Sequence, residues 1–145
     1  MEQKDNRDEP YFEKIQKYGR DVNPFFKLMG IDVTKVEEGK AYLSMKVRPD
    51  MLNGVGWLQG AIFTALADEA MALALYTRTD RHERIATVSE SSSFLKGART
   101  GTIVASGWVV KKARQVAFME GEVRRGGEEG ELLAQSNAVF VIMNE

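Results

Sequence analysis

The sequence predicts an α+β fold in which an antiparallel sheet wraps around one central apolar helix. Apolar side chains follow a two-residue period from Ile31 onward, which is typical of half-buried strands. A segment from about Gln59 to Thr77 is rich in Ala, Leu and Met, which favour helix, and several long strand-like runs follow it. Because the helical segment is apolar on nearly all sides, a sheet that wraps around it is the arrangement that buries it.

The N-terminal region is predicted to hold two short helices behind a polar, charged arm. Residues 1–10 form the arm, and the first helix covers Tyr11–Tyr18. The second helix covers Phe25–Met29, because Asn23-Pro24 is a typical helix start and Gly30 a typical helix end.

The strands are predicted from apolar alternation and from the turn residues between them. In the run Ala41–Val47, every second side chain is apolar, so these side chains are expected on one face of a hairpin strand. The predicted strands are Ile31–Val36, Ala41–Val47, Ile85–Leu95, Thr102–Lys112, Gln115–Arg124 and Leu132–Met143.

Charge and composition exclude several classes of partner and compartment. The net charge is −1, with Lys and Arg spread along the chain, so no nucleic-acid partner is expected. The chain has no cysteine, which excludes disulfides and thiolate chemistry. The N-terminus is polar, and the longest apolar stretch, Ala61–Tyr76, is too short to span a bilayer and contains two carboxylates. We therefore expect a cytoplasmic protein with no membrane partner.

Familiar catalytic centres can be excluded by elimination. The single histidine, His82, lies in the charged run Arg78–Arg84 and is expected to be a surface residue, which argues against a Ser-His-Asp or Cys-His site. Gly54-Val55-Gly56 lacks the third glycine of a dinucleotide fingerprint. With one histidine and no cysteine, we expect no metal site and no cofactor.

Two features of the central helix remain as candidates for chemistry. Asp68 and Glu69 interrupt an apolar segment, and burying a carboxylate is costly unless it is paired or hydrogen-bonded. The pair could mark a polar stripe that reaches solvent or a subunit interface, or one carboxylate could have a raised pKa and act as base or nucleophile. Gly60 at the helix start could supply N–H donors to an oxyanion or could be only a turn residue.

The order and spacing of three short motifs resemble the hotdog-fold thioesterases of the phenylacetate-degradation (PaaI-like) type. Asn53-Gly54, Gln59-Gly60-Ala61 and Leu66–Ala70 stand where that family typically reads Asn-Gly, His-Gly-Gly and Leu-Ala-Asp-Glu-Ala. The likeness covers roughly residues 24–143, and the later strands that resemble the family contain Ala86–Ser89, Ser93–Lys96, Val109–Arg114 and Leu133–Phe140. The resemblance implies an N-terminal arm and helix at residues 1–22 and a single hotdog thioesterase domain at residues 23–145.

The resemblance also implies roles for individual residues. Asp68 would be the catalytic carboxylate, either as nucleophile or as general base for water. The backbone N–H of Gly60 would polarise the thioester carbonyl, and Asn53 would position the water or the carbonyl. The residues expected to contact substrate are Gln59, Thr87, Lys96 and Arg114, with the acyl pocket walled by Phe63, Met71, Phe94 and Trp108.

The function implied is hydrolysis of an acyl-CoA to free CoA and a carboxylic acid, with CoA entering only as part of the substrate and no separate cofactor. The resemblance also implies a homodimer or a dimer of dimers, in which Asn53 and Gly60 of one subunit face Asp68 of the other. Gln59 and Ala61 replace the family's usual histidine and second glycine. A non-catalytic acyl-CoA-binding or ligand-sensing module is therefore the alternative.

Overall fold

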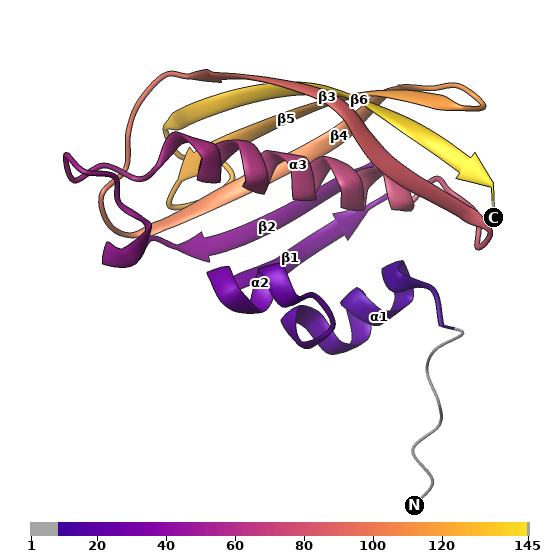
Figure 1. Cartoon of the computed structure of the whole chain (residues 1–145), viewed down its shortest axis with the longest axis horizontal. Coiled ribbons are helices and arrows are strands. Elements are labelled where there is room, and N and C mark those ends of the chain that lie inside the picture. Colours follow the sequence, from indigo (N-terminus) through magenta and orange to yellow (C-terminus); the bar gives the residue numbers. More distant parts are fainter. Residues whose placement is uncertain (1–8, 145) are drawn as a thin grey trace, which may run out of the picture.

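The computed structural model describes residues 9–144, so most of the predicted charged arm lies outside the described residues. Six strands and three α-helices account for most of this part of the chain (Figure 1). The helices are α1 (Tyr11–Tyr18), α2 (Pro24–Met29) and α3 (Gly60–Tyr76), and the strands are β1 (Ile31–Glu37), β2 (Lys40–Lys46), β3 (Glu83–Phe94), β4 (Thr102–Lys112), β5 (Val116–Arg125) and β6 (Leu132–Asn144).

The strands form one antiparallel sheet in the order β1-β2-β4-β5-β6-β3, and α3 lies across it (Figure 1). The predicted α+β architecture is confirmed. In this order β1 and β3 are the edge strands, whereas β4, β5 and β6 are central. The chain reaches the far edge through α3, because β3 follows the helix directly and pairs with the last strand, β6.

Element boundaries agree with the predicted ones to within two residues, because the local signals are strong. The side chain of Asn23 caps α2 by accepting a hydrogen bond from the Phe26 N–H at 3.1 Å, and Pro24 occupies the first turn. Gly30 ends α2 with a φ of 72°, which favours glycine. The predicted inward face of β2 is also confirmed, since Ala41, Leu43 and Met45 are buried.

Two glycines allow α3 to approach the sheet closely. Gly107 on β4 and Gly121 on β5 are direct partners in the antiparallel register, and both lie beneath the middle of α3. A Cβ atom at Gly107 would lie 2.4 Å from the backbone N of Met71 and 2.5 Å from the carbonyl carbon of Ala70. The helix backbone therefore rests directly on the sheet, which leaves no room for a side chain at this point.

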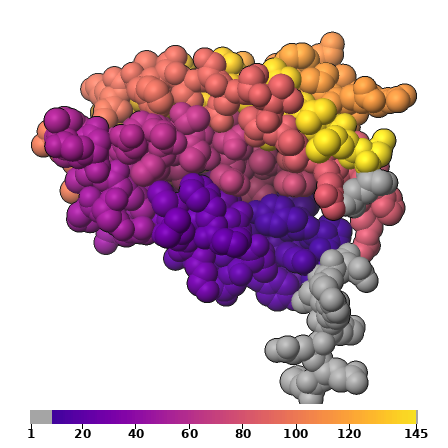
Figure 2. All heavy atoms as spheres, in the orientation of Figure 1, coloured from indigo at the N-terminus to yellow at the C-terminus, as the bar shows by residue number. Residues whose placement is uncertain are grey.

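One side of α3 is not covered within the single chain. Ala61, Ala65, Asp68 and Ala72 recur every three or four residues along one side of the helix, and none is fully buried. Figure 2 shows part of α3, in magenta, open between the indigo N-terminal helices and the strands. The sheet wraps around α3 as predicted, and the sheet and the N-terminal helices together leave this stripe only partly covered.

The close approach of α3 makes a specific prediction for stability. Gly107→Ala should lower the free energy of unfolding by about 1–3 kcal/mol, because the added methyl group meets helix backbone that cannot rotate away. Urea unfolding measures the effect. Gly127→Ala is the matched control, since a Cβ atom there meets nothing within 4 Å. Equal stability of the two variants would contradict the proposed packing.

Candidate active site

The predicted carboxylate Asp68 and the predicted substrate contact Thr87 are brought together by α3 and β3. The Thr87 hydroxyl donates a hydrogen bond of 2.6 Å to Oδ1 of Asp68. Thr87 pairs with the buried Phe140 of β6, which places its side chain on the sheet face toward α3. Asp68 is only partly buried, so one of its oxygens is fixed while the carboxylate remains near the uncovered side of the helix.

A second carboxylate, Glu90, lies beside Asp68 and was not among the predicted residues. The register of β3 shifts between Thr87 and Ser89, so that Thr87 and Glu90 both point toward α3. A chain of hydroxyls continues along the same face: Thr64 donates to Ser92 at 3.0 Å, and Ser92 and Ser136 lie 2.7 Å apart. The space between α3 and β3 is therefore polar, unlike the rest of the helix–sheet contact.

The environment of Glu90 favours its neutral form. Burial raises the pKa of Glu90 to about 7, and the Asp68 carboxylate adds to the increase. Its Oε2 atom is buried and has no hydrogen-bond partner among the described residues. The sequence of the run Thr87–Phe94 could have pointed to Glu90. A strand that packs one face against a core normally carries apolar side chains on that face, and this run carries polar ones instead.

The other predicted catalytic residues are Asn53, in the loop before α3, and Gly60, the first residue of α3. The side-chain oxygen of Asn53 accepts hydrogen bonds from the N–H groups of Val55 and Trp57, at 3.0 and 3.1 Å, and so closes the loop before the helix. Gln59 is the N-cap residue, and its side chain makes no capping hydrogen bond. Asn53 therefore orders the loop with its oxygen, and its amide NH2 group is left for another partner.

Gly60 is the first residue of α3, where backbone N–H groups have no acceptor within the helix. A Cβ atom at Gly60 would lie 3.6 Å from the Phe94 ring, so this N–H lies beside an aromatic wall. The ring of Phe94 also packs against Phe63, with centroids 6.3 Å apart. The helix start thus combines a hydrogen-bond donor, positive helix-end potential and apolar surface.

The two predicted basic contacts, Lys96 and Arg114, are not brought together. Lys96 follows β3 near the start of α3 and forms an ion pair with Glu131, with an N–O distance of 3.2 Å. Arg114 lies in the turn between β4 and β5. The β4–β5 turn lies at the end of the sheet opposite to Lys96. Ala117, just after this turn, pairs with Phe140 of β6, and Phe140 pairs with Thr87 in the first half of β3. Lys96 instead follows the last residue of β3.

The expectation that Trp108 walls the acyl pocket is wrong. Its neighbour Gly107 faces α3, and consecutive strand residues point to opposite faces. The Trp108 indole N–H donates to Glu120 at 3.2 Å, and the Lys40 ammonium lies 5.4 Å from the indole ring. Trp108 therefore belongs to the outer face of the sheet.

Glu69 points away from Asp68, toward α1. Burial, with a smaller contribution from the charge of Asp68, raises the pKa of Glu69 to about 7. The charge of Glu69 in turn contributes to the raised pKa values of Tyr11 on α1 and Tyr76 on α3. The two neighbouring acids thus occupy separate environments, and only Asp68 faces β3.

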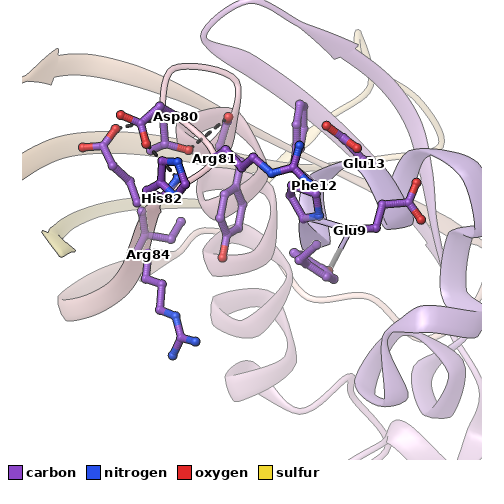
Figure 3. A pocket seen from close by; sticks show the side chains of 13 residues that line it. Glu9, Phe12, Glu13, Asp80, Arg81, His82 and Arg84 are labelled. Carbon is purple, nitrogen blue, oxygen red and sulfur yellow. Dashed lines mark hydrogen bonds between the residues drawn. The ribbon is translucent and has the colours of Figure 1, made fainter. Parts of the chain in front are cut away.

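A separate cleft lies away from these residues. It has a volume of about 720 Å³ and runs between α1 and the segment of residues 79–85 (Figure 3). Its lining includes Glu9, Arg81 and the exposed His82, but none of the predicted catalytic residues. Within residues 9–144, no group of three His, Cys, Asp or Glu residues is placed to hold a metal, and no helix there is long and apolar enough to cross a membrane.

The raised pKa of Glu69 predicts a pH-dependent stability. The folded state binds this proton more tightly than the unfolded chain, whose pKa stays near 4.5, so stability falls as pH rises from about 4.5 to about 7. Glu69→Gln should therefore stabilise the protein at pH 8 by on the order of 1–3 kcal/mol and give no gain at pH 4.5. Urea unfolding at both pH values checks this, with Glu129→Gln in an exposed turn as control. A gain at both pH values alike would contradict the assignment.

Comparison with known proteins agrees with this geometry. The family model of the thioesterase superfamily matches residues 56–131, which is more than half of the chain and includes α3 and β3. A variant of the phenylacetic acid degradation protein PaaI from Thermus thermophilus is 28% identical, with a TM-score of 0.74, covering 82% of this chain and 98% of that one. The Escherichia coli PaaI protein is 22% identical, with a TM-score of 0.80 and coverage of 92% and 94%. A Haemophilus influenzae thioesterase is 20% identical, with a TM-score of 0.77 and 84% of each chain covered.

The fold and the family match agree with one another. The chain belongs to the thioesterase superfamily and is a thioester hydrolase with a hotdog fold, similar in structure to the PaaI proteins.

Proposed function

We propose that the protein hydrolyses acyl-CoA thioesters to free CoA and a carboxylic acid, with Asp68 as the catalytic carboxylate. The observation that carries this proposal is the hydrogen bond from Thr87 to Oδ1 of Asp68, at 2.6 Å. It orients the Asp68 carboxylate of a largely apolar helix toward the uncovered side of that helix. Without a cysteine, and with its single histidine exposed, the chain offers carboxylates as its means of activating water.

The reaction needs two groups that act on one carbonyl. The Gly60 N–H, at the positive end of α3, donates to the thioester oxygen as negative charge develops there. Asp68 takes a proton from the attacking water, or attacks the carbonyl itself to give an anhydride that water then opens. In both routes the C–S bond breaks, the sulfur leaves as CoA thiolate or thiol, and the acyl group leaves as a carboxylate.

These two groups cannot act together within one chain. Gly60 and Asp68 are eight residues apart on the same helix, which separates them by about 12 Å along its axis. A carbonyl held by the Gly60 N–H is therefore out of reach of Asp68 of the same subunit. We infer that each site combines Asn53 and Gly60 of one subunit with Asp68 of the partner subunit.

The surface of the single chain is compatible with such a dimer. β3 is a long edge strand with exposed apolar side chains: Val88 is 64% exposed and Phe94 is 54% exposed. An unprotected edge of this kind readily pairs with a second strand. It borders the uncovered stripe of α3, so a partner that pairs with β3 also covers Asp68.

The acyl group is expected to lie against Phe94 and Phe63 next to Gly60. Gln59 at the helix start can donate and accept hydrogen bonds but cannot titrate, so it serves to orient the substrate. Lys96 and Arg114 lie at opposite ends of the sheet of one subunit, and each remains a proposed contact for the phosphates of CoA.

Asp68→Asn should lower kcat at least about 100-fold, because the amide neither accepts a proton nor attacks the carbonyl. Thiol release from phenylacetyl-, short-, medium- and long-chain acyl-CoAs measures the effect. The exposed Asp21→Asn is the matched control and should keep the parent rate. Full activity of the Asp68 variant would contradict the role of this residue. Saturable binding of acyl-CoA by the parent without any turnover would favour the binding-module alternative.

A shared site makes a separate prediction. Gly60→Pro removes the N–H at the first helical position, where proline is tolerated, whereas Gly60→Ala keeps it. Gly60→Pro should be inactive alone, as should Asp68→Asn. Co-expressed variants should recover about one quarter of the parent activity, since half of randomly paired dimers are mixed and each mixed dimer has one intact site. No recovery from dimers shown to be mixed would contradict the shared site.

A further inference from the structure

Glu90, unlike Glu69 on the side of α1, faces Asp68 from β3, and the proposed reaction assigns it no part. It lies on the helix-facing side of β3, in register with the buried Ala138 of β6, and thus in the layer between sheet and helix. An ionised carboxylate in this layer is costly unless it is compensated. Its place beside a catalytic acid calls for a physical explanation.

The groups around Glu90 come from three elements. α3 presents Asp68 and Thr64, β6 presents Ser136 and Ala138, and β3 itself contributes neighbouring hydroxyls. Asp68 is the charged group that acts on Glu90, and no basic side chain among the described residues contributes to its pKa. A second negative charge here would therefore face the first without a counter-ion.

The hydroxyls near Glu90 hydrogen-bond with one another and also with the Glu90 carboxyl, whose pKa Ser136 and Ser92 lower. Ser92 and Ser136 share a hydrogen bond of 2.7 Å, and Ser92 also accepts from Thr64 at 3.0 Å. Oε2 of Glu90 remains buried without a partner among the described residues. A protonated carboxyl has an O–H to donate, and Asp68 is the strongest acceptor nearby.

We propose that Glu90 is a positioning residue for the reaction: its protonated carboxyl donates a hydrogen bond to Asp68, so that the two acids together hold one proton. Asp68 is then held by two donors, Thr87 from one strand position and Glu90 from the next position on the same face. This inference rests on the proposed function of Asp68, since positioning matters only if Asp68 acts on the substrate.

The electrostatics of the pair support this arrangement. Burial, followed by the charge of Asp68 and its ability to accept a hydrogen bond, raises the pKa of Glu90 to about 7, although Ser136 and Ser92 act in the opposite direction. Above neutral pH the shared proton is lost, the two carboxylates repel each other, and Asp68 leaves its fixed position.

The test is the pH profile of kcat for the parent and two variants. The parent should lose activity above about pH 7, approaching tenfold per pH unit. Glu90→Gln keeps a donor that cannot titrate, so it should stay within about threefold of the parent at pH 6 and lose the alkaline decline. Glu90→Leu removes the donor and should lower kcat about tenfold or more at pH 6, with KM changed less than twofold.

Three outcomes would overturn the proposal. These are an alkaline decline in Glu90→Gln like that of the parent, a Glu90→Leu variant with the parent kcat, and a Glu90→Leu variant whose loss lies in KM. Glu120→Gln, a carboxyl on the outer face of the sheet, is the matched control and should keep the parent profile. A purely structural role of Glu90 would change the melting temperature of the variants and leave the shape of the pH profile unchanged.

Carboxyl ¹³C NMR separates this inference from the proposed function, because it needs no turnover. The Glu90 signal should titrate near neutral pH in the parent and at lower pH in Asp68→Asn. A Glu90 midpoint near that of an ordinary glutamate would overturn the shared proton whatever the activity. A protein without turnover but with coupled titration would contradict the proposed function while the carboxyl pair stands.

Discussion

The contact between α3 and the paired glycines of β4 and β5 is the constraint on which the rest of the structure depends. Gly107 and Gly121 leave no side chain between helix and sheet, so the helix backbone lies against the strands. This contact fixes both the height and the rotation of α3. The rotation decides which helix residues are buried, which face α1 and which remain open.

The chemistry follows from that rotation. Phe63, Leu66 and Met71 face the core, Glu69 faces α1, and Asp68 faces β3 beside the open stripe. Asp68 and Glu69 are adjacent carboxylic acids on one helix, but they therefore lie in different environments. The same geometry separates the helix start from Asp68 by more than the size of a thioester group, which makes a second subunit part of the proposed mechanism.

The sequence predicted the fold well because its signals were local. Alternating apolar residues in β2, the cap at Asn23 and the stop at Gly30 each specify structure without knowledge of the rest of the chain. The motifs around Asp68 and Gly60 likewise located the helix and its carboxylate. The resemblance named Asp68 and Thr87 as separate site residues, and their direct contact, between residues nineteen positions apart in the chain, is visible only in the structure.

Other features depended on tertiary geometry and could not be predicted locally. The shift of register after Thr87 turns Glu90 toward Asp68, and a shift of this kind is visible only once β3 is paired with β6. The outward direction of Trp108 follows from Gly107, whose role depends on the helix above it. The separation of Lys96 from Arg114 depends on the order of strands in the sheet, which strand prediction alone does not give.

The most direct test of the account is a crystal structure of the protein with an acyl-CoA analogue in which a methylene group replaces the thioester sulfur. The account predicts that the analogue carbonyl oxygen lies about 3 Å from the Gly60 N–H of one subunit, with the carbonyl carbon facing Asp68 of the partner subunit. A carbonyl bound away from Gly60, or one that meets no carboxylate from a second subunit, would contradict it.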